Sequence, residues 1–501
     1  MAVLKCKMCG APLEAVAGAE IIECKYCLTQ QTIEGAVDQS KPMMYERGEM
    51  LLNDGYFEKA EGYFEKALDL NYKSSDAYLG LEMARCKVKT IEDLAKHYAK
   101  SNKEESPELR HAKEFAKDKS WVEIFESTLN METEIVQANL NDIDNRLSVF
   151  RNKSKAAKNL VAVSGDSYAI INIYGEVEQF YRRKESIKLD WKNITSIYLR
   201  DGVLFGIDEN GTVKCTDQAI QEKISSWTDI VQITTDYPFL ALKKDGTVIA
   251  FPYDNSKITF DFSHLKNIVQ IETLYGCTMA LTNEGKVIPF EIEPSFASKI
   301  ATWENISEIF LSKNLSFEIT VHAITKYGEF LHAGGSTPSF FPNKNWHDFV
   351  SGTSQNGCFI LVKSDGTTCG ADFYTTRRNA SAKNLENVLA VLAEQSYILA
   401  IQNDGNVIIK EHYDTQPYLP TYDEKIFNCI DTINEDRQFA IKKLEIKKRK
   451  QEEEAKRQEE LKKQQELIAS RKASGVCQHC GSKFKGLFTK VCSSCGKKKD
   501  Y

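Results

Sequence analysis

The sequence lacks the long apolar run that a membrane-spanning segment requires. No hydrophobic stretch in its 501 residues reaches the roughly 18 residues needed to cross a bilayer, and its first residues hold no apolar core long enough for a signal peptide. A strong excess of charge is also missing, because 65 basic and 71 acidic residues leave a net charge of -6. No overall positive field therefore marks nucleic acid as the partner. We expect a soluble, cytoplasmic chain of roughly three domains.

The common sequence signatures of catalysis are absent as well. The chain has no phosphate-cradling Gly-x-x-x-x-Gly-Lys loop, no His-Glu-x-x-His helix and no Gly-x-Ser-x-Gly nucleophile elbow. Its eight histidines are scattered along the chain. The sequence therefore favours a binding protein over an enzyme.

Cysteines are the first strong positive signal. Eight of the 14 fall in four Cys-x-x-Cys pairs, and the pairs are joined two by two through loops of 14 and 11 residues. Two such pairs supply four thiolates for one tetrahedral ion, with each sulfur about 2.3 Å from the metal. A redox dithiol would instead come as one pair, and four thiolates leave no open position for a catalytic water. We predict two structural Zn²⁺ ions, with these ligands: Cys6, Cys9, Cys24 and Cys27; Cys477, Cys480, Cys492 and Cys495.

Glycines support the same interpretation. Gly10, Gly481 and Gly496 follow a Cys-x-x-Cys pair, where they permit the sharp turn of a metal-binding knuckle. His479 stands inside a pair and is expected to face solvent, because four cysteines already saturate the ion. The six remaining cysteines are scattered, which fits a reducing compartment.

Residues 1–36 and 474–501 resemble small bacterial zinc ribbons, the first of the kind that precedes helical repeats. The resemblance implies a bound metal rather than a particular partner. The second ribbon is locally basic, which leaves open a phosphate-contacting surface as well as an ordinary solvated one. Its lysines are Lys483, Lys485, Lys490, Lys497, Lys498 and Lys499.

Residues 43 to 76 resemble a tetratricopeptide repeat, with a small residue at Gly48 and a turn at Asn53-Asp54-Gly55. One or two repeats bury too little apolar surface to stand alone, so residues 37–155 are expected to form one helical domain. A peptide-binding groove and a plain helical hairpin both remain open for it. The residues that carry these expectations are Ala60, Phe64 and Ala67 at close-packing positions, and Trp121, Ile124, Phe125 and Leu129 on one apolar stripe.

A turn glycine recurs seven times between residues 156 and 441, with a branched apolar residue four positions before it. A fixed spacing across a turn indicates a hairpin, because side chains on one face recur with period two. Asn or Asp precedes four of the glycines, so we predict two-residue turns. The glycines are Gly175, Gly211, Gly246, Gly285, Gly328, Gly366 and Gly405.

A second marker precedes each hairpin: a strand such as Asp-Ile-Val-Gln-Ile, with a tryptophan two residues before four of the seven. Each unit then carries about four short strands in roughly 38 residues, the size of a propeller blade. We predict a seven-bladed all-β propeller over 156–441, with a half-unit at 428–441 closing the ring beside the first blade. The tryptophans are Trp191, Trp227, Trp303 and Trp346.

This pattern resembles the propeller repeat of the regulator of chromosome condensation family. The resemblance implies the fold. The family's histidine, eight residues before the turn glycine, is replaced in all seven units, and the Gly-x-Asn-x-x-Gly loop is missing from most. We therefore expect neither the nucleotide-exchange activity nor the chromatin binding of the type member to carry over.

Residues 442–473 are predicted to form a charged helix, since 16 of the 22 residues from 442 to 463 are charged and many stand at i and i+4. A solvated spacer about 45 Å long and a coiled coil are both open.

The expected function is an intracellular, zinc-binding scaffold that binds proteins through its propeller and helical repeat. The alternatives are a nucleic-acid-associated protein that acts through the ribbons and a guanine-nucleotide exchange factor. Partner identity and oligomeric state are left open.

Overall fold

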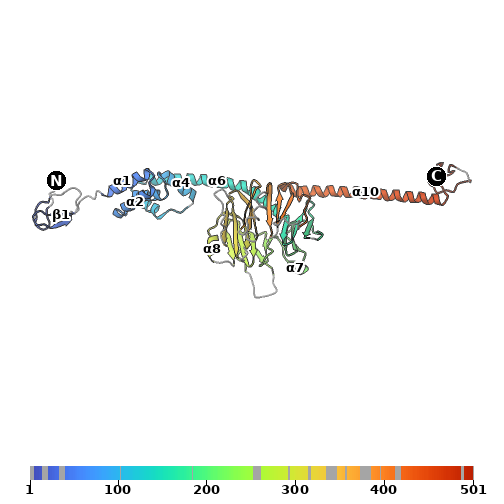
Figure 1. Ribbon diagram of the computed structural model, residues 1–501, viewed down its shortest axis with the longest axis horizontal. Helices are drawn as coiled ribbons and strands as arrows, with labels where there is room; N and C mark the ends of the chain where they lie inside the picture. Colours follow the sequence, from blue (N-terminus) through green and yellow to red (C-terminus); the bar gives the residue numbers. More distant parts are fainter. Residues whose placement is uncertain are drawn as a thin grey trace. The chain divides into compact units, whose positions relative to one another are not determined.

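The computed structural model divides the chain into two compact units, Met1–Asp142 and Ile143–Tyr501, which are described separately below (Figure 1). None of the helices it describes combines the length and apolar character needed to cross a membrane. The described residues are 5–13, 21–32, 40–101, 103–182, 184–251, 261–290, 294–313, 318–334, 347–355, 358–372, 385–394, 397–411, 419–486 and 490–499.

The first unit contains a small hairpin followed by helices. The hairpin pairs β1 (Ile21–Glu23) with β2 (Gln30–Thr32) in antiparallel fashion. The helices are α1 (Ser40–Asn53), α2 (Phe57–Leu70), α3 (Ser75–Arg85), α4 (Ile91–Ser101), α5 (Pro107–Phe115) and the first part of α6 (Ser120–Lys158).

Phe64 is the central side chain of the helical domain. It is buried on α2, together with Ala60 and Ala67. A Cβ atom at Gly48 of α1 would lie 2.9 Å from its ring, and one at Gly80 of α3 would lie 2.4 Å from it. The predicted requirement for a small residue at Gly48 is therefore confirmed, and Gly80 meets the same requirement from the other side.

The predicted apolar stripe on α6 is correct for three of its four residues. Phe125 is fully buried, and Trp121 and Leu129 pack against the same core. Ile124 is exposed, so its inclusion was wrong. Successive residues of a helix point about 100° apart, so the residue next to Phe125 leaves the face that the i and i+4 positions share.

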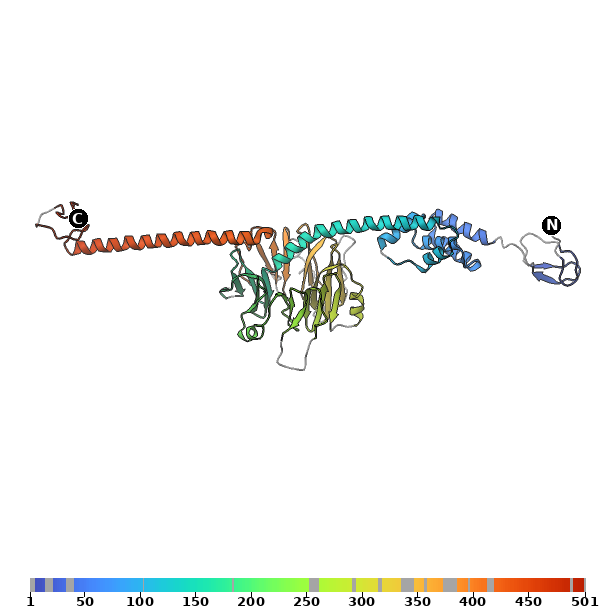
Figure 2. The ribbon, with the colours of Figure 1, turned by 180° about the vertical axis from the view of Figure 1, so that it is seen from behind.

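The second unit is built from seven successive small antiparallel sheets within the described residues, in a propeller-type arrangement (Figure 2). The first sheet is β3 (Val161–Ser164), β4 (Ser167–Ile171), β5 (Val177–Tyr181) and β6 (Ile187–Leu189); the second is β7 (Ile194–Arg200), β8 (Val203–Asp208) and β9 (Val213–Cys215); the third is β10 (Ile230–Ile233), β11 (Leu240–Lys243) and β12 (Val248–Ala250); the fourth is β13 (Ile268–Leu274), β14 (Cys277–Thr282) and β15 (Val287–Phe290). The fifth is β16 (Ile306–Lys313), β17 (Ile319–Thr325) and β18 (Phe330–Gly334); the sixth is β19 (Phe349–Gln355), β20 (Cys358–Lys363) and β21 (Thr368–Asp372); the seventh is β22 (Val388–Ala393), β23 (Tyr397–Gln402) and β24 (Val407–Glu411).

The expectation of four strands in every unit holds only for the first sheet within the described residues; the other six sheets have three. Short helices follow the third strand in two of them. They are α7 (Gln218–Lys223), after β9, and α8 (Pro294–Ile300), after β15. Asp217 accepts a hydrogen bond from the Ile220 amide and so stabilises the start of α7.

The hairpin turns have three loop residues rather than the predicted two. In the second sheet the Gly211 amide donates to Asp208 O at 2.9 Å and the Asp208 amide donates to Thr212 O at 3.0 Å. This is a type I turn followed by a glycine with positive φ, here 76°. The same pair of bonds recurs at all seven turn glycines. The Asn-Gly and Asp-Gly pairs were therefore correct markers of hairpins but of the wrong loop length.

A second recurring residue is the Asn or Asp that leads into the innermost strand of a sheet, called here the lead-in residue. Its φ lies between 56° and 65°, in the left-handed region that Asn and Asp tolerate best after glycine. Its carbonyl accepts a hydrogen bond from the residue just after the second strand, for example from the Lys244 amide to Asp229 O at 2.8 Å. The lead-in residues are Asn193, Asp229, Asn267, Asn305, Asp348 and Asn387.

The ring closes through residues 419 to 430, not through the predicted strand at 428–441. Ile426 donates its amide to Gly405 O at 2.9 Å, and Ile426 and Phe427 are fully buried in one cluster with residues of the first and seventh sheets. Tyr397 of the seventh sheet donates to Ser167 O of the first at 2.7 Å. The predicted half-unit is wrong because the chain becomes helical: η1 spans Ile430–Thr432 and α10 spans Ile433–Ala473.

Local chemistry explains the helix. Glu435 and Asp436 lie in its first turn, where acidic residues favour the helix N-terminus, and Asp436 accepts a hydrogen bond from the Cys429 amide. The expected limits at 155/156 and 441/442 fall inside α6 and α10, and α10 ends at 473. The limit at 36/37 and Trp346 lie outside the described residues.

The corrected closure gives a direct test with two phenylalanines. Phe427→Ala removes a fully buried ring and is expected to lower the free energy of unfolding of the propeller by about 3–5 kcal/mol. Phe439→Ala is the matched control, since that side chain is 69% exposed on α10, and its effect should stay within about 0.5 kcal/mol. Urea unfolding followed by tryptophan fluorescence measures both. Equal losses of unfolding free energy in the two variants would contradict ring closure through residues 419 to 430 and would favour the predicted strand at 428–441.

Candidate metal centres and channel site

The first cysteine cage is built by two matching knuckles. In each, the amide four residues after the first cysteine donates to that cysteine's carbonyl: Gly10 to Cys6 and Leu28 to Cys24, both at 2.8 Å. The four sulfurs converge, with Cys6 Sγ 3.7 Å from Cys27 Sγ and Cys9 Sγ 3.5 Å from Cys24 Sγ. Sulfurs at the corners of a tetrahedron about 2.3 Å from a central ion would lie about 3.8 Å apart. The cage therefore has the size that Zn²⁺ requires.

The second cage repeats this geometry at the other end of the chain. Gly481 donates to Cys477 O at 2.7 Å and Gly496 donates to Cys492 O at 2.8 Å. The Sγ–Sγ distances are 3.7 Å for Cys477–Cys495 and 3.6 Å for Cys480–Cys492. Gly10, Gly481 and Gly496 all have positive φ, as the knuckle prediction requires.

In each cage, hydrogen bonds with a hydroxyl residue favour the thiolate form, which binds metal, at one of the four cysteines. The side chain and backbone of Thr29 lower the pKa of Cys27 to about 6. Ser482 does the same for Cys480, and its hydrogen bonds lower that pKa to about 6. Both donors lie two residues after the cysteine, so the local turn supplies them.

The structure brings all eight predicted cysteines into two groups, each with its four sulfurs within 4.8 Å of one another. His479 is exposed and is not part of the second group, as expected. The scattered cysteines whose side chains are described behave differently: burial raises the pKa of Cys277 to about 12 and that of Cys215 to about 11. They act as small apolar residues rather than as ligands.

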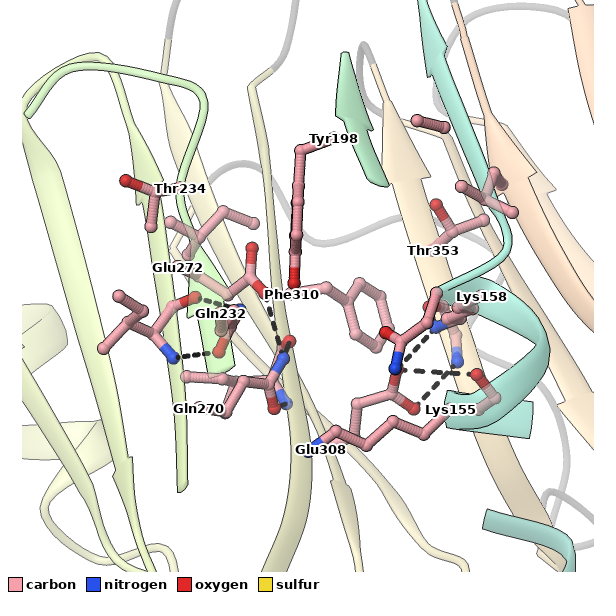
Figure 3. Close-up of a pocket in the computed structure, with 18 of the residues that line it drawn as sticks. Lys155, Lys158, Tyr198, Gln232, Thr234, Gln270, Glu272, Glu308, Phe310 and Thr353 are labelled. Carbon is pink, nitrogen blue, oxygen red and sulfur yellow. Dashed lines mark hydrogen bonds and ion pairs between the residues drawn. The ribbon is translucent and has the colours of Figure 1, made fainter. Parts of the chain in front are cut away.

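A channel of about 730 Å³ with both polar and apolar lining residues lies between the innermost strands of the seven sheets and the end of α6 (Figure 3). It is lined by residues of all seven innermost strands, from Val161–Val163 of β3 to Val391 and Leu392 of β22. From α6 it receives Arg151, Asn152, Lys155 and Lys158.

Glutamine side chains join neighbouring sheets inside this channel. Gln232 of β10 donates from Nε2 to Ile271 O of β13 at 2.7 Å and accepts from the Ile271 amide at 3.0 Å. Gln270 of β13 makes the same two bonds to Ile309 of β16, at 2.7 and 3.0 Å. Each carboxamide thus pairs with the main chain of the next sheet as a peptide group of a strand would.

Glu308 occupies the same position on β16, but a carboxylate cannot donate. It accepts from the Gly352 amide of β19 at 3.2 Å. The missing donor comes from α6: Lys158 Nζ donates to Gly352 O at 2.7 Å and to Glu308 Oε1 at 2.5 Å. Figure 3 shows this group at the end of α6. Lys158 and Glu308 together therefore supply the donor and the acceptor that one glutamine side chain supplies in Gln232 and Gln270. Their ion pair attaches the end of α6 to the lining of the channel.

Glu272 lines the channel, and the pKa of its carboxyl group is shifted far from its ordinary value. Burial raises its pKa to about 7, although the hydrogen bond from Gln270 and the nearby Lys158 ammonium act in the opposite direction. Gln270 Nε2 donates to Glu272 Oε1 at 3.0 Å. Burial also raises the pKa of Tyr198, beside it in the channel, to about 12.

These channel residues were missed in the sequence. A signal existed for two of them, because Gln232 and Gln270 occupy the same column of the repeated Ile-Val-Gln-Ile strand. Glu308 stands in the same column, which is occupied by Ser196, Ser351 and Ala390 in other units. No pattern marks Lys158, since it is 150 residues away from its partner.

No protein-family model and no curated protein matches the chain. Among solved structures it is similar to the CRINKLY WD40 ectodomain of the Arabidopsis thaliana receptor kinase ACR4, at 14% identity and a TM-score of 0.39, over 52% of this chain and 97% of that one. It is also similar to Prp20p of Saccharomyces cerevisiae, at 12% identity and a TM-score of 0.28, over 54% and 76%. A third is the C-terminal domain of gp131 from bacteriophage phiKZ, at 10% identity and a TM-score of 0.30, over 55% and 99%. The propeller architecture rests on the sheets of this chain rather than on these likenesses.

The channel geometry predicts a non-additive pair of substitutions. Lys158→Met leaves the Glu308 carboxylate without its cation and should cost about 2 kcal/mol of propeller stability. Glu308→Gln supplies the missing donor and should cost less than about 1 kcal/mol. In the double variant the glutamine replaces both groups, so a coupling energy of about 1–2 kcal/mol is expected from urea unfolding.

Lys155→Met is the control for this cycle, because Lys155 lines the same channel from the same helix. It should show no such coupling to Glu308→Gln. Strict additivity of Lys158→Met and Glu308→Gln would contradict the assigned role.

Proposed function

We propose that this chain is a zinc-binding scaffold that recognises other proteins through a closed seven-bladed propeller and a tetratricopeptide-like helical domain. The proposal rests on the hydrogen bonds that the polar side chains of the channel make. Gln232, Gln270 and Glu308 each pair with the main chain of the next sheet. Their polar atoms hold the ring together, which favours a rigid binding platform over a catalytic cavity.

The closed ring is supported by repetition of one joint. The amide at the start of an innermost strand donates to the turn glycine of the preceding sheet, at 2.9–3.2 Å, in five successive sheets and again at Ile426. The seventh sheet then meets the first through Tyr397 and Ser167. Closure leaves no open sheet edge between first and last blade, which protects such a ring from aggregation.

Zinc is the metal we propose for both cages. Four sulfurs at tetrahedral spacing select a soft tetrahedral ion, and the Thr29 and Ser482 hydrogen bonds favour the thiolate at Cys27 and at Cys480. When bound, Zn²⁺ supplies a cross-link between two knuckles. Four sulfur ligands leave no position for a water molecule, so we assign the ions a structural role.

The helical domain is the second proposed recognition surface. Gly48 and Gly80 bring α1 and α3 against the Phe64 ring of α2, the close packing that tetratricopeptide repeats need. Several surfaces on one chain raise the effective concentration of a partner that contacts two of them.

Nucleic acid is the second candidate partner, because six lysines of the C-terminal ribbon are exposed. They could contact phosphates without reading sequence. This contact would be confined to the ribbon, since the whole chain carries a net charge of -6.

Metal analysis tests the zinc assignment. We expect about two zinc ions per chain after purification without added metal. Cys24→Ser should lower the content to about one ion and leave the propeller transition unchanged, because distant sites are additive. Cys86→Ser is the control, since that thiol lies in the helical domain, and it should retain both ions. A content near zero in folded, reduced protein contradicts the assignment.

Affinity capture with the full chain separates protein partners from nucleic acid. A protein scaffold should keep its partners after nuclease treatment and after all six ribbon lysines are changed to glutamine. Binding through six phosphate contacts would instead weaken about 1,000-fold between 50 and 200 mM salt. Mass spectrometry identifies the partners, and their loss on nuclease treatment would replace the scaffold by the nucleic-acid function.

A further inference from the structure

Helix α6 carries apolar side chains on two of its faces. The first face holds Phe125 and Leu129, which pack into the core of the helical domain. The second holds Ile124, Met131 and Ile135, which are 43%, 54% and 47% exposed. Residues four and seven positions apart lie on one side of a helix, so these three side chains lie together. Ile124, which leaves the core-facing stripe, thus belongs to a second stripe.

The second face has the spacing of a coiled-coil seam. Steps of four and three residues alternate along it over two heptads, and no charged residue occupies any of its positions. A coiled coil buries the side chains at such positions against a second helix. The positions are called here the outer seam, and they are Ile124, Thr128, Met131, Ile135 and Ala138.

The charges along this part of α6 are all of one sign. From residue 120 to residue 145 the helix has six acidic residues and no lysine, arginine or histidine. Two of the six are neutralised from elsewhere, since Glu126 pairs with Lys113 and Asp144 pairs with Arg151. The uncompensated acidic charge therefore lies on the remaining four.

Glu132 and Glu134 place part of this charge directly beside the outer seam. Glu132 follows Met131 and Glu134 precedes Ile135, which are the positions whose charges select the partner in a coiled coil. Neither glutamate forms an ion pair within the part of the chain that the structure describes. A second helix on the seam would bring its own flanking charges next to these two carboxylates.

Single exposed apolar residues are common on protein surfaces, but those of the outer seam are in register and flanked by unpaired charge of one sign. We propose that the outer seam binds a helical segment of a partner protein that carries apolar residues in heptad spacing with lysine or arginine beside them. The inference rests on the proposed function, because it names the kind of partner that the helical domain recognises.

A second copy of this chain fits the outer seam less well. Two α6 seams would bring glutamates against glutamates, which opposes pairing. Helix α10 is basic, since six of the nine residues from 442 to 450 are lysine or arginine. Its exposed apolar residues do not share one face, however, because Ile441 lies about 200° around the helix from Phe439. Neither helix therefore offers a continuous apolar seam with basic flanks.

The length of the outer seam suits a short partner helix. Ile124 and Ala138 are 14 residues apart, or about 21 Å at 1.5 Å per residue. A stable interface between folded proteins buries roughly 800 Å² on each side, which is more than five small side chains offer. Packing of Phe125 and Leu129 already holds α6 as a helix, so only the partner segment loses conformational freedom on binding.

The test uses the full chain and two synthetic peptides about 21 residues long, or three heptads. Both have isoleucine and leucine at the seam positions, and they differ only beside the seam, where one has lysine and the other glutamate. Fluorescence anisotropy at about 50 mM salt, where screening is weak, measures the affinity of each. We expect the lysine peptide to bind at least about tenfold more tightly than the glutamate peptide.

Variants of the seam and of its flanks separate binding from folding. Met131→Gln with Ile135→Gln keeps the helix propensity and should weaken the lysine peptide at least about tenfold. Met50→Gln is the matched control, since Met50 is 45% exposed on α1, and it should leave the affinity unchanged. Glu132→Lys with Glu134→Lys should reverse the preference toward the glutamate peptide, which a loss of folding would not do. Circular dichroism checks the helix content of every variant.

Three results overturn the proposal. The first is that the wild type shows no preference between the two peptides or binds neither. The second is that the variant with Met131→Gln and Ile135→Gln binds the lysine peptide as the wild type does. The third is self-association of the wild type in sedimentation velocity that this variant loses, which would make a second copy the occupant. Protein partners captured equally by the wild type and this variant would leave the scaffold function standing and overturn this inference alone.

Discussion

The propeller depends on one main-chain hydrogen bond, donated at the start of an innermost strand to the turn glycine of the preceding sheet. The bond brings two backbones so close that no side chain fits between them. A Cβ atom at Gly211 would lie 2.7 Å from the Cα of Asp229, and one at Gly405 would lie 2.0 Å from the carbonyl oxygen of Phe427. Glycine is therefore required twice over, for its positive φ and for this close approach. The sequence repeat therefore has the same spacing as this hydrogen-bonded contact between successive sheets.

That double requirement explains how much of the fold the sequence revealed. The glycine column and the apolar column before it located all seven hairpins, because both are imposed by short-range geometry. The loop length was mistaken because the Asn-Gly and Asp-Gly pairs also mark two-residue turns. The end of the ring was mistaken for a different reason: residues 433–441 repeat apolar positions of a strand, yet Glu435 and Asp436 give them a helical N-terminus. The local preference for a helix determined the structure of residues 433–441, because closure of the ring does not use them as a strand.

The candidate sites divide in the same way. Each cysteine knuckle is a local structure, so spacing alone identified all eight cysteines that gather in the two groups. The channel is built from residues far apart in sequence. Gln232 and Ile271 are 39 residues apart, and Lys158 and Glu308 are 150 apart. The sequence neighbours of Lys158 and of Glu308 do not indicate that these two residues form an ion pair. Leu28 belongs to a third kind, because its sequence neighbours predict a knuckle while only the backbone angle shows that leucine occupies a position suited to glycine.

The ion pair at the end of α6 also sets an order of events during synthesis. Lys158 leaves the ribosome 150 residues before Glu308, an interval of roughly 8 to 30 seconds at typical elongation rates of about 5–20 residues per second. The helix end exists before any strand of the ring, and the first four sheets follow it. The fifth sheet brings the carboxylate, the sixth brings the carbonyl of Gly352, and the buried pair Ile426 and Phe427 comes last. The residues of α6 that line the channel are thus synthesised before every strand that surrounds them.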